Sequence, residues 1–211
     1  MALTNLTGNT GSKPPMGNNG GNINNAGSIL GPFMSPPADN NDEVLELLID
    51  YNEEFKTSGT ILFRDNVIRQ TLATLICKNK PNALLIGSAG VGKTKIVEDI
   101  AYRLAANDPL VPDKLKGYTV YELPIANIVS GSSLIGQLEQ KLQSVIDFAT
   151  DPKNKVILFI DEIHQLVSQS DHYQKLAQIL KPALARGNFH CIGATTLQES
   201  TTPVSYTHLR A

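Results

Sequence analysis

The 211-residue chain has no tryptophan, only two cysteines and no strong excess of either charge. Cys77 and Cys191 stand far apart and outside any cluster at metal-ligand spacing, so neither a disulfide framework nor a zinc site is indicated. A formal net charge of -2 provides no global attraction to nucleic acid. No apolar run reaches the roughly 18 residues that span a bilayer, and no signal peptide pattern begins the chain. We predict a cytoplasmic protein with neither membrane nor nucleic-acid partners.

The first 40 residues are poor in both charge and periodic apolar residues. Asn, Gly, Pro, Ser and Thr dominate them, and Lys13 and Asp39 are the only charged side chains. Such a segment cannot bury enough apolar surface to offset the entropy lost on ordering. We therefore predict a disordered leader over residues 1–40, followed by an ordered domain over 41–203.

Beyond the leader, helical and strand patterns alternate along the chain. Apolar residues at helical spacing predict helices over 41–55 and 66–78, the second stopped by Pro81. Strands are expected at 83–86, 118–123, 156–160 and 189–194, with a helix ending at 105 and helices at 134–148 and 173–185 between them. Because several of these strands are almost wholly apolar, we expect an α/β fold in which helices cover both faces of a parallel sheet.

A glycine-rich turn follows the first apolar strand. It fits the phosphate-binding pattern G-x-x-x-x-G-K-[ST] and leads into a helix, which is the context that this motif requires. Glycines allow the backbone amides to wrap a phosphate chain, and the helix N-terminus adds partial positive charge. Lys93 would reach the β- and γ-phosphates, and Thr94 would hold Mg²⁺. The predicted ATP-binding residues of this P-loop are Gly87, Ser88, Ala89, Gly90, Val91, Gly92, Lys93 and Thr94.

Two adjacent carboxylates, Asp161 and Glu162, end the apolar strand 156–160. Ligands of open α/β sheets bind at that edge of the sheet. Asp161 is placed to coordinate Mg²⁺, and Glu162 to polarise the water that attacks the γ-phosphate. His164 follows closely, but a single histidine without partner ligands predicts neither a base nor a metal site. Thr195 and Thr196 follow the strand 189–194 at the same edge, and one of their hydroxyls could sense the γ-phosphate or orient that water.

Together these segments resemble the first ATPase domain of the Clp-type AAA+ unfoldases and disaggregases, the ClpA, ClpB and ClpC group. The likeness covers 61–196 and is most specific in 156–164, 181–187 and 190–196. It implies the three-layer P-loop NTPase sandwich of the AAA+ large subdomain, with the family strand order 5-1-4-3-2. It also implies Thr196 as the sensor-1 residue, and Ile61 and Leu62 as the stretch that packs on adenine. A hexameric ring, protein substrates and possibly a protease partner would follow.

The chain departs from that pattern at three places. Leu134 stands where the family's pore loop carries an aromatic residue, and Phe63 replaces a small residue beside the adenine pocket. Residues 204–211 resemble the translation of a sequencing adapter, so genuine protein is expected to end near Thr202 or Pro203. The arginine fingers, the fifth strand and the lid would then lie outside this chain, which leaves the strand 83–86 as an unpaired apolar edge.

Two other functions stay open from the sequence. One is an AAA+ loader or helicase-like ATPase that acts on nucleic acid, although no basic groove supports it. The other is a nucleotide-binding fragment that does not hydrolyse ATP, because arginine fingers are worth about 10³–10⁵ in rate.

Overall fold

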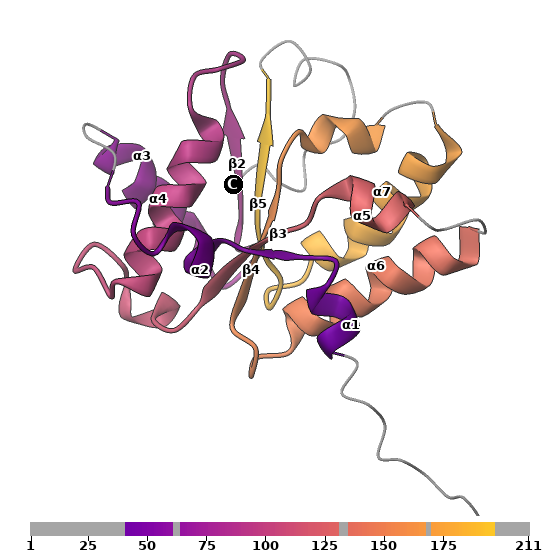
Figure 1. Cartoon of the computed structure of the whole chain (residues 1–211), viewed down its shortest axis with the longest axis horizontal. Coiled ribbons are helices and arrows are strands. Elements are labelled where there is room, and N and C mark those ends of the chain that lie inside the picture. Colours follow the sequence, from indigo (N-terminus) through magenta and orange to yellow (C-terminus); the bar gives the residue numbers. More distant parts are fainter. Residues whose placement is uncertain (1–40, 61–63, 131–134, 168–169, 197–211) are drawn as a thin grey trace, which may run out of the picture. The chain divides into compact units, whose positions relative to one another are not determined.

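A computed structural model of the chain describes residues 41–60, 64–130, 135–167 and 170–196. All of them lie within one compact unit, Asp39–Ala211. A five-stranded sheet forms its centre, in the order β1-β3-β4-β5-β2 (Figure 1). The strands are β1 (Ile49–Asp50), β2 (Asn82–Ile86), β3 (Thr119–Glu122), β4 (Val156–Ile160) and β5 (His190–Thr195). β2, β5, β4 and β3 pair in parallel, and β1 joins β3 antiparallel.

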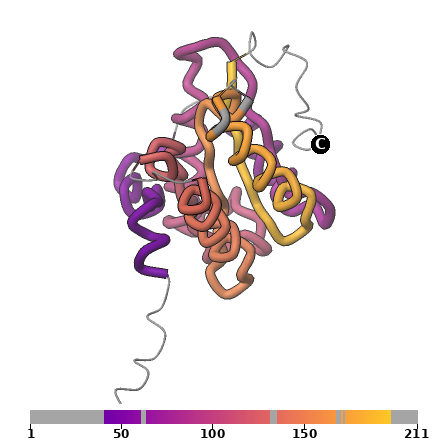
Figure 2. The backbone as a smooth tube through the Cα atoms, turned by 90° about the vertical axis from the view of Figure 1, so that its right-hand side faces the viewer, coloured from indigo at the N-terminus to yellow at the C-terminus, as the bar shows by residue number. Residues whose placement is uncertain are grey.

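Helices cover both faces of the sheet and enclose a separate core on each. The longer helices are α3 (Asp65–Leu75), α4 (Lys93–Ala105), α6 (Ile135–Thr150) and α7 (Asp171–Leu184), and the shorter ones are α1 (Asn41–Leu45), α2 (Tyr51–Phe55) and α5 (Ile125–Val129). α2, α3 and α4 pack on one face, whereas α1, α5, α6 and α7 pack on the other. Figure 2 turns this second group of helices toward the viewer. The predicted three-layer α/β sandwich is therefore confirmed.

Strand β4 divides its side chains between the two cores. Val156, Leu158 and Ile160 point into the core under α6 and α7, and Ile157 and Phe159 into the core under α3 and α4. All five are at most 1% exposed. This alternation follows from the two-residue period of a strand. Because both faces of β4 are covered by helices, every residue of the strand must be apolar, which accounts for the unbroken apolar run.

The sequence predicted the four parallel strands to within two residues at each end. Their order, β2-β5-β4-β3, also matches the 1-4-3-2 part of the expected family order. Among the described strands, β2 pairs with β5 alone, which agrees with the edge position predicted for 83–86.

The prediction of one helix over 41–55 is wrong. Ile49 and Asp50 instead form β1 and pair with Glu122 and Tyr121 of β3. The carboxylate of Asp50 then accepts a hydrogen bond from the backbone N–H of Glu53 at 3.0 Å and caps the new helix α2. At Ile49 and Asp50, backbone hydrogen bonds to β3 thus replace the helical hydrogen bonds that the apolar spacing predicted. The short helix α5 and two 3₁₀ turns, η1 (Asp113–Leu115) and η2 (Ile163–Val167), were not predicted either.

Both cysteines are free thiols, Cys77 exposed and Cys191 buried. Burial raises the pKa of the Cys191 thiol to about 12. Within the described ranges, no helix is long and apolar enough to cross a membrane.

Candidate nucleotide-binding site

The P-loop connects the end of β2 to the start of α4, as the motif predicted. Gly90 and Gly92 have φ angles of 73° and 92°, in the left-handed region that glycine adopts without strain. A Cβ atom on Gly90 would meet no heavy atom within 4 Å apart from those of its chain neighbours, so the loop surface is open at this residue. Gly92 is also the N-cap of α4, a helix of 13 residues whose first amides face the loop. The loop therefore has the geometry of an anion cradle.

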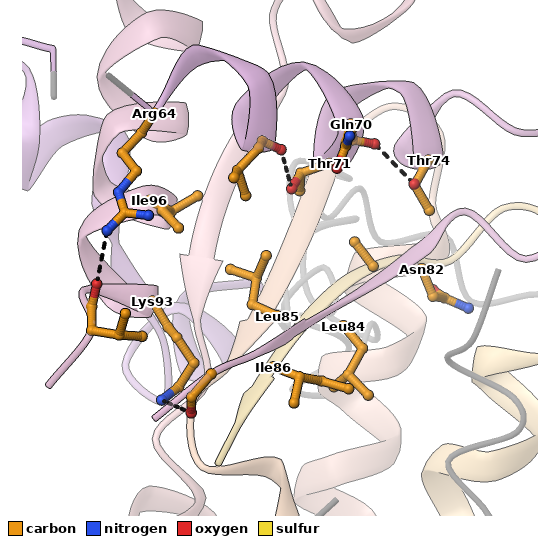
Figure 3. Close-up of a pocket in the computed structure, with 14 residues that line it drawn as sticks. Arg64, Gln70, Thr71, Thr74, Asn82, Leu84, Leu85, Ile86, Lys93 and Ile96 are labelled. Carbon is orange, nitrogen blue, oxygen red and sulfur yellow. Dashed lines mark hydrogen bonds between the residues drawn. The ribbon is translucent and has the colours of Figure 1, made fainter. Parts of the chain in front are cut away.

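Lys93 lies beneath this loop and is only 8% exposed. Its ammonium group donates to the carbonyl oxygens of Gly87 and Ser88, both at 3.2 Å. Figure 3 shows the side chain reaching along the end of β2 toward Gly87. A buried ammonium at a helix N-terminus gives the cradle a second source of positive charge.

Thr94 brings the P-loop helix into direct contact with the end of β4. Its hydroxyl donates to Oδ2 of Asp161 at 2.8 Å, and Oδ1 of Asp161 accepts from the backbone N–H of Glu162, also at 2.8 Å. Mg²⁺ takes oxygen ligands of this kind, usually one or two from protein with the rest from phosphates and water. The described residues hold no cluster of three or more His, Cys, Asp or Glu that could hold a metal alone. The oxygens of Thr94 and Asp161 fit a magnesium ion that takes its other ligands from nucleotide phosphates and water.

Glu162 occupies an unusual backbone conformation immediately after Asp161. Its φ is 47°, which costs a residue with a side chain on the order of 1–3 kcal/mol. Its side chain is 42% exposed, and Oε2 lies 3.1 Å from Nδ1 of His164. The same His164 nitrogen lies 3.4 Å from the hydroxyl of Thr195. The contact between His164 and Thr195 could not be predicted from the sequence, because it depends on how the end of β5 lies beside η2.

Thr196 directly follows β5, at the sheet edge where the sequence placed it. The strand's last residue, Thr195, is fully buried, and its carbonyl accepts the backbone N–H of Gly87 at 3.3 Å. That bond places the end of β5 beside the start of the P-loop. The predicted site residues of the P-loop, Asp161, Glu162 and Thr196 are thus brought to one edge of the sheet. Ile61, Leu62, Phe63 and Leu134 lie outside the described residues.

A cavity of about 510 Å³ opens between α3 and β2 next to the P-loop. Figure 3 shows its lining, which includes Arg64, Thr71, Ile86 and Lys93. The guanidinium of Arg64 donates to the carbonyl of Val91 in the P-loop at 3.5 Å. Small-molecule sites commonly have about 300–1,000 Å³ and a mainly apolar lining with a few polar groups. Sequence reasoning missed Arg64, although it lies only two residues after Leu62, the end of the stretch assigned to adenine.

Glu122 adds a further carboxylate at the end of β3. The hydroxyl of Tyr51 donates to its Oε2 at 2.8 Å. Burial raises the pKa of Glu122, and the negative charges of Asp161 and Glu54 raise it further, while the bond from Tyr51 acts in the opposite direction. The pKa of Tyr51 is raised too, first by its own burial. The carboxylates of Glu122, at the end of β3, and Asp161, directly after β4, therefore repel each other.

Comparison with known proteins agrees with this geometry. Residues 83–206, more than half of the chain, match the family described as "ATPase family associated with various cellular activities (AAA)". The chain is 44% identical over 141 residues to the chaperone protein ClpB of Staphylococcus epidermidis, and 45% identical over 141 residues to ClpB of Dichelobacter nodosus. In both cases the match covers 66% of this chain and 16% of the ClpB protein. The chain thus spans about one sixth of the length of these relatives.

Solved structures of Hsp104 are similar as well. A complex of Saccharomyces cerevisiae Hsp104 with ADP matches with a TM-score of 0.69 and 33% identity, over 80% of this chain and 30% of Hsp104. A closed state of Hsp104 with ATPγS and casein matches with a TM-score of 0.65 and 35% identity, over 74% of this chain and 28% of Hsp104. The chain belongs to the AAA family of ATPases and, within it, to the Clp type that these chaperones represent.

Proposed function

We propose that the chain binds ATP with Mg²⁺ and hydrolyses it, as part of a hexameric ring that unfolds or remodels proteins. The observation that carries this proposal is the 2.8 Å bond between Thr94 and Asp161, which joins the P-loop helix to the strand end that bears Glu162. Membership of the AAA family supports nucleotide binding.

The residues of the P-loop share the work of binding the phosphates. Amides of 87–92 bind the phosphate chain, and the ammonium of Lys93 turns from the carbonyls of Gly87 and Ser88 toward the β- and γ-phosphates. The cavity beside Arg64 receives the base and ribose. The family resemblance assigns the contact with adenine to Ile61 and Leu62, which lie outside the described residues. Binding at the helix N-terminus orients the terminal phosphate toward β4.

The oxygens of Thr94 and Asp161 would hold the metal ion. An ion bound there would supply positive charge that offsets the negative charge developing on the phosphates. The carboxylate of Glu162 accepts the proton of the attacking water, and Thr196 orients that water from the end of β5. Lys93 thus contributes to binding and, through the γ-phosphate, to catalysis, whereas Glu162 serves the proton transfer alone.

The protein substrate is proposed from the relatives. ClpB is named a chaperone, and Hsp104 has been solved with casein. Casein is therefore the first substrate to test, and turnover that rises with unfolded casein would support a protein remodeller. Turnover stimulated by DNA and indifferent to casein would instead favour the loader or helicase-like alternative. A protease partner and the cytoplasmic location stay predictions from the sequence.

Two substitutions test the assigned roles in the 211-residue chain. We expect Lys93→Ala to weaken binding of fluorescent ATP by about 100-fold or more, because it removes a largely buried charge from the phosphates. We expect Glu162→Gln to keep the affinity within about twofold and to lower turnover by about 10²–10⁴-fold, the usual contribution of a general base. Lys95→Ala is the matched control, since Lys95 lies two residues along the same helix with an exposed side chain.

Each outcome separates one part of the proposal. Unchanged ATP affinity in Lys93→Ala would contradict the binding site. Unchanged turnover in Glu162→Gln would contradict the role of the carboxylate. Binding without turnover in the unaltered chain would replace hydrolysis by the nucleotide-binding alternative.

A further inference from the structure

The imidazole of His164 lies between Glu162 and the end of β5. Its Nδ1 is 3.1 Å from Oε2 of Glu162 and 3.4 Å from Oγ1 of Thr195. The ring is 22% exposed, whereas the side chain of Glu162 is 42% exposed. The better-buried partner is therefore the histidine.

The chemistry of the two partners decides which nitrogen carries the proton. An ionised carboxylate only accepts hydrogen bonds and repels the lone pair of an unprotonated nitrogen, so the 3.1 Å separation between Oε2 of Glu162 and Nδ1 of His164 favours a proton on Nδ1. A neutral imidazole then has its unprotonated nitrogen at Nε2. The hydroxyl of Thr195 is able to accept from the same Nδ1–H at its longer distance.

His164 is anchored more firmly than the carboxylate it contacts. It belongs to η2, whose residues Ile163 and Leu166 are 2% and 5% exposed and pack in the core under α6 and α7. Ile163 lies so close to β5 that a Cβ atom on Gly193 would be 3.1 Å from its Cδ1. The side chain of Glu162, in contrast, has three rotatable bonds and projects from a strained residue. A fixed donor beside it restricts the side chain of Glu162 to rotamers that keep Oε2 near His164.

The other neighbour of His164 connects this contact to the P-loop. Thr195 is fully buried, and its carbonyl accepts the first amide of the P-loop, that of Gly87. A continuous set of contacts therefore runs from Gly87 through Thr195 and His164 to Glu162.

We propose that His164 is a positioning residue for Glu162, which holds the carboxylate by an Nδ1–H donor and is itself steadied by Thr195. This inference rests on the proposed function, because it gives Glu162 the role of base. His164 acts on the geometry of that base and touches no nucleotide.

Turnover of matched variants gives the first test. We expect His164→Phe, which keeps a ring but loses the donor, to lower kcat about tenfold and to leave KM and ATP affinity within about twofold. His164→Asn places an amide N–H near the position of Nδ1 and should restore most of kcat, whereas His164→Gln places it farther out and should not. Gln165→Ala, an exposed neighbour on the same turn, is the control and should match the unaltered chain.

Equal kcat in His164→Phe and the unaltered chain would overturn the inference and leave the proposed function standing. Equal loss in the Asn and Phe variants would also overturn it, because a donor at Nδ1 would then have no effect. A loss of ATP affinity in step with kcat would indicate a merely structural role.

The protonated nitrogen of His164 gives a second test that needs no turnover. The chain has four histidines, so long-range ¹⁵N–¹H spectra resolve their rings. At about pH 8, where an ordinary imidazole is neutral, we expect the Nδ1–H tautomer for His164. Glu162→Ala should shift the ring toward Nε2–H. A tautomer that is the same in both proteins overturns the proposal, even where the chain binds ATP without hydrolysing it.

Discussion

Replacing Tyr51 with Phe isolates one hydrogen bond at the edge of the candidate site. Tyr51 is 5% exposed, and its hydroxyl donates to Oε2 of Glu122 at 2.8 Å. The ring packs on Phe55 and Phe159, with centroids 4.9 Å and 5.7 Å away, and phenylalanine keeps both contacts. The substitution therefore removes the donor and leaves the core filled.

The pKa of Glu122 fixes how this loss depends on pH. Burial raises that pKa above its ordinary value of 4.5, and the bond from Tyr51 lowers it, so the bond favours the ionised carboxylate. Stability that Glu122 contributes is present below about its ordinary pKa and is lost as pH rises through the raised folded value. Without the hydroxyl the folded pKa rises further, and the loss with pH becomes larger. We expect Tyr51→Phe to cost about 1 kcal/mol at pH 8 and less at pH 5.

Urea unfolding at the two pH values measures this difference. The chain has no tryptophan, so circular dichroism is the suitable probe. Tyr118→Phe serves as a control, because Tyr118 is half-buried at the other end of β3 and contacts the ring of His190. A destabilisation by Tyr51→Phe that is equal at both pH values, or larger at pH 5, would refute this account of Glu122.

Three further predictions concern stability and use the same unfolding assay. A Cβ atom on Gly187 would lie 2.5 Å from the carbonyl oxygen of Lys78, a backbone atom that cannot swing away, so Gly187→Ala should cost about 1–3 kcal/mol. Gly136→Ala, in α6 with open space around it, should instead gain about 0.5–1 kcal/mol, and a loss there would contradict the argument. Arg103→Ala removes a buried cation that bonds Asp99 at 2.9 Å and should cost about 3–5 kcal/mol; a change under 1 kcal/mol would show that the pair contributes little.

The parts of the fold that the sequence predicted are those whose signal is local. β4 needs apolar side chains on both faces, so its run of five apolar residues by itself predicts a strand that is covered by helices on both sides. The P-loop likewise depends on the backbone freedom of Gly90 and Gly92, which no other residue type supplies as readily.

The parts that were missed depend on contacts across long stretches of sequence. β1 forms because Ile49 pairs with Glu122, and the helical spacing around it contains no trace of that partner. The contact between His164 and Thr195 joins residues 31 positions apart. It exists because β4 and β5 run parallel with Ile160 opposite Gly193, a register that pattern alone does not give.

The two-faced packing of β4 also limits which changes of length this chain tolerates. Deleting one residue inside β4 would exchange the core of every side chain beyond the deletion, because neighbouring side chains point to opposite faces. It would also move the end of the strand by about 3.3 Å, the rise of one residue, which is enough to break the 2.8 Å hydrogen bond between Thr94 and Asp161. The number of residues between Val156 and Asp161 therefore determines where the carboxylates of Asp161 and Glu162 lie relative to the P-loop.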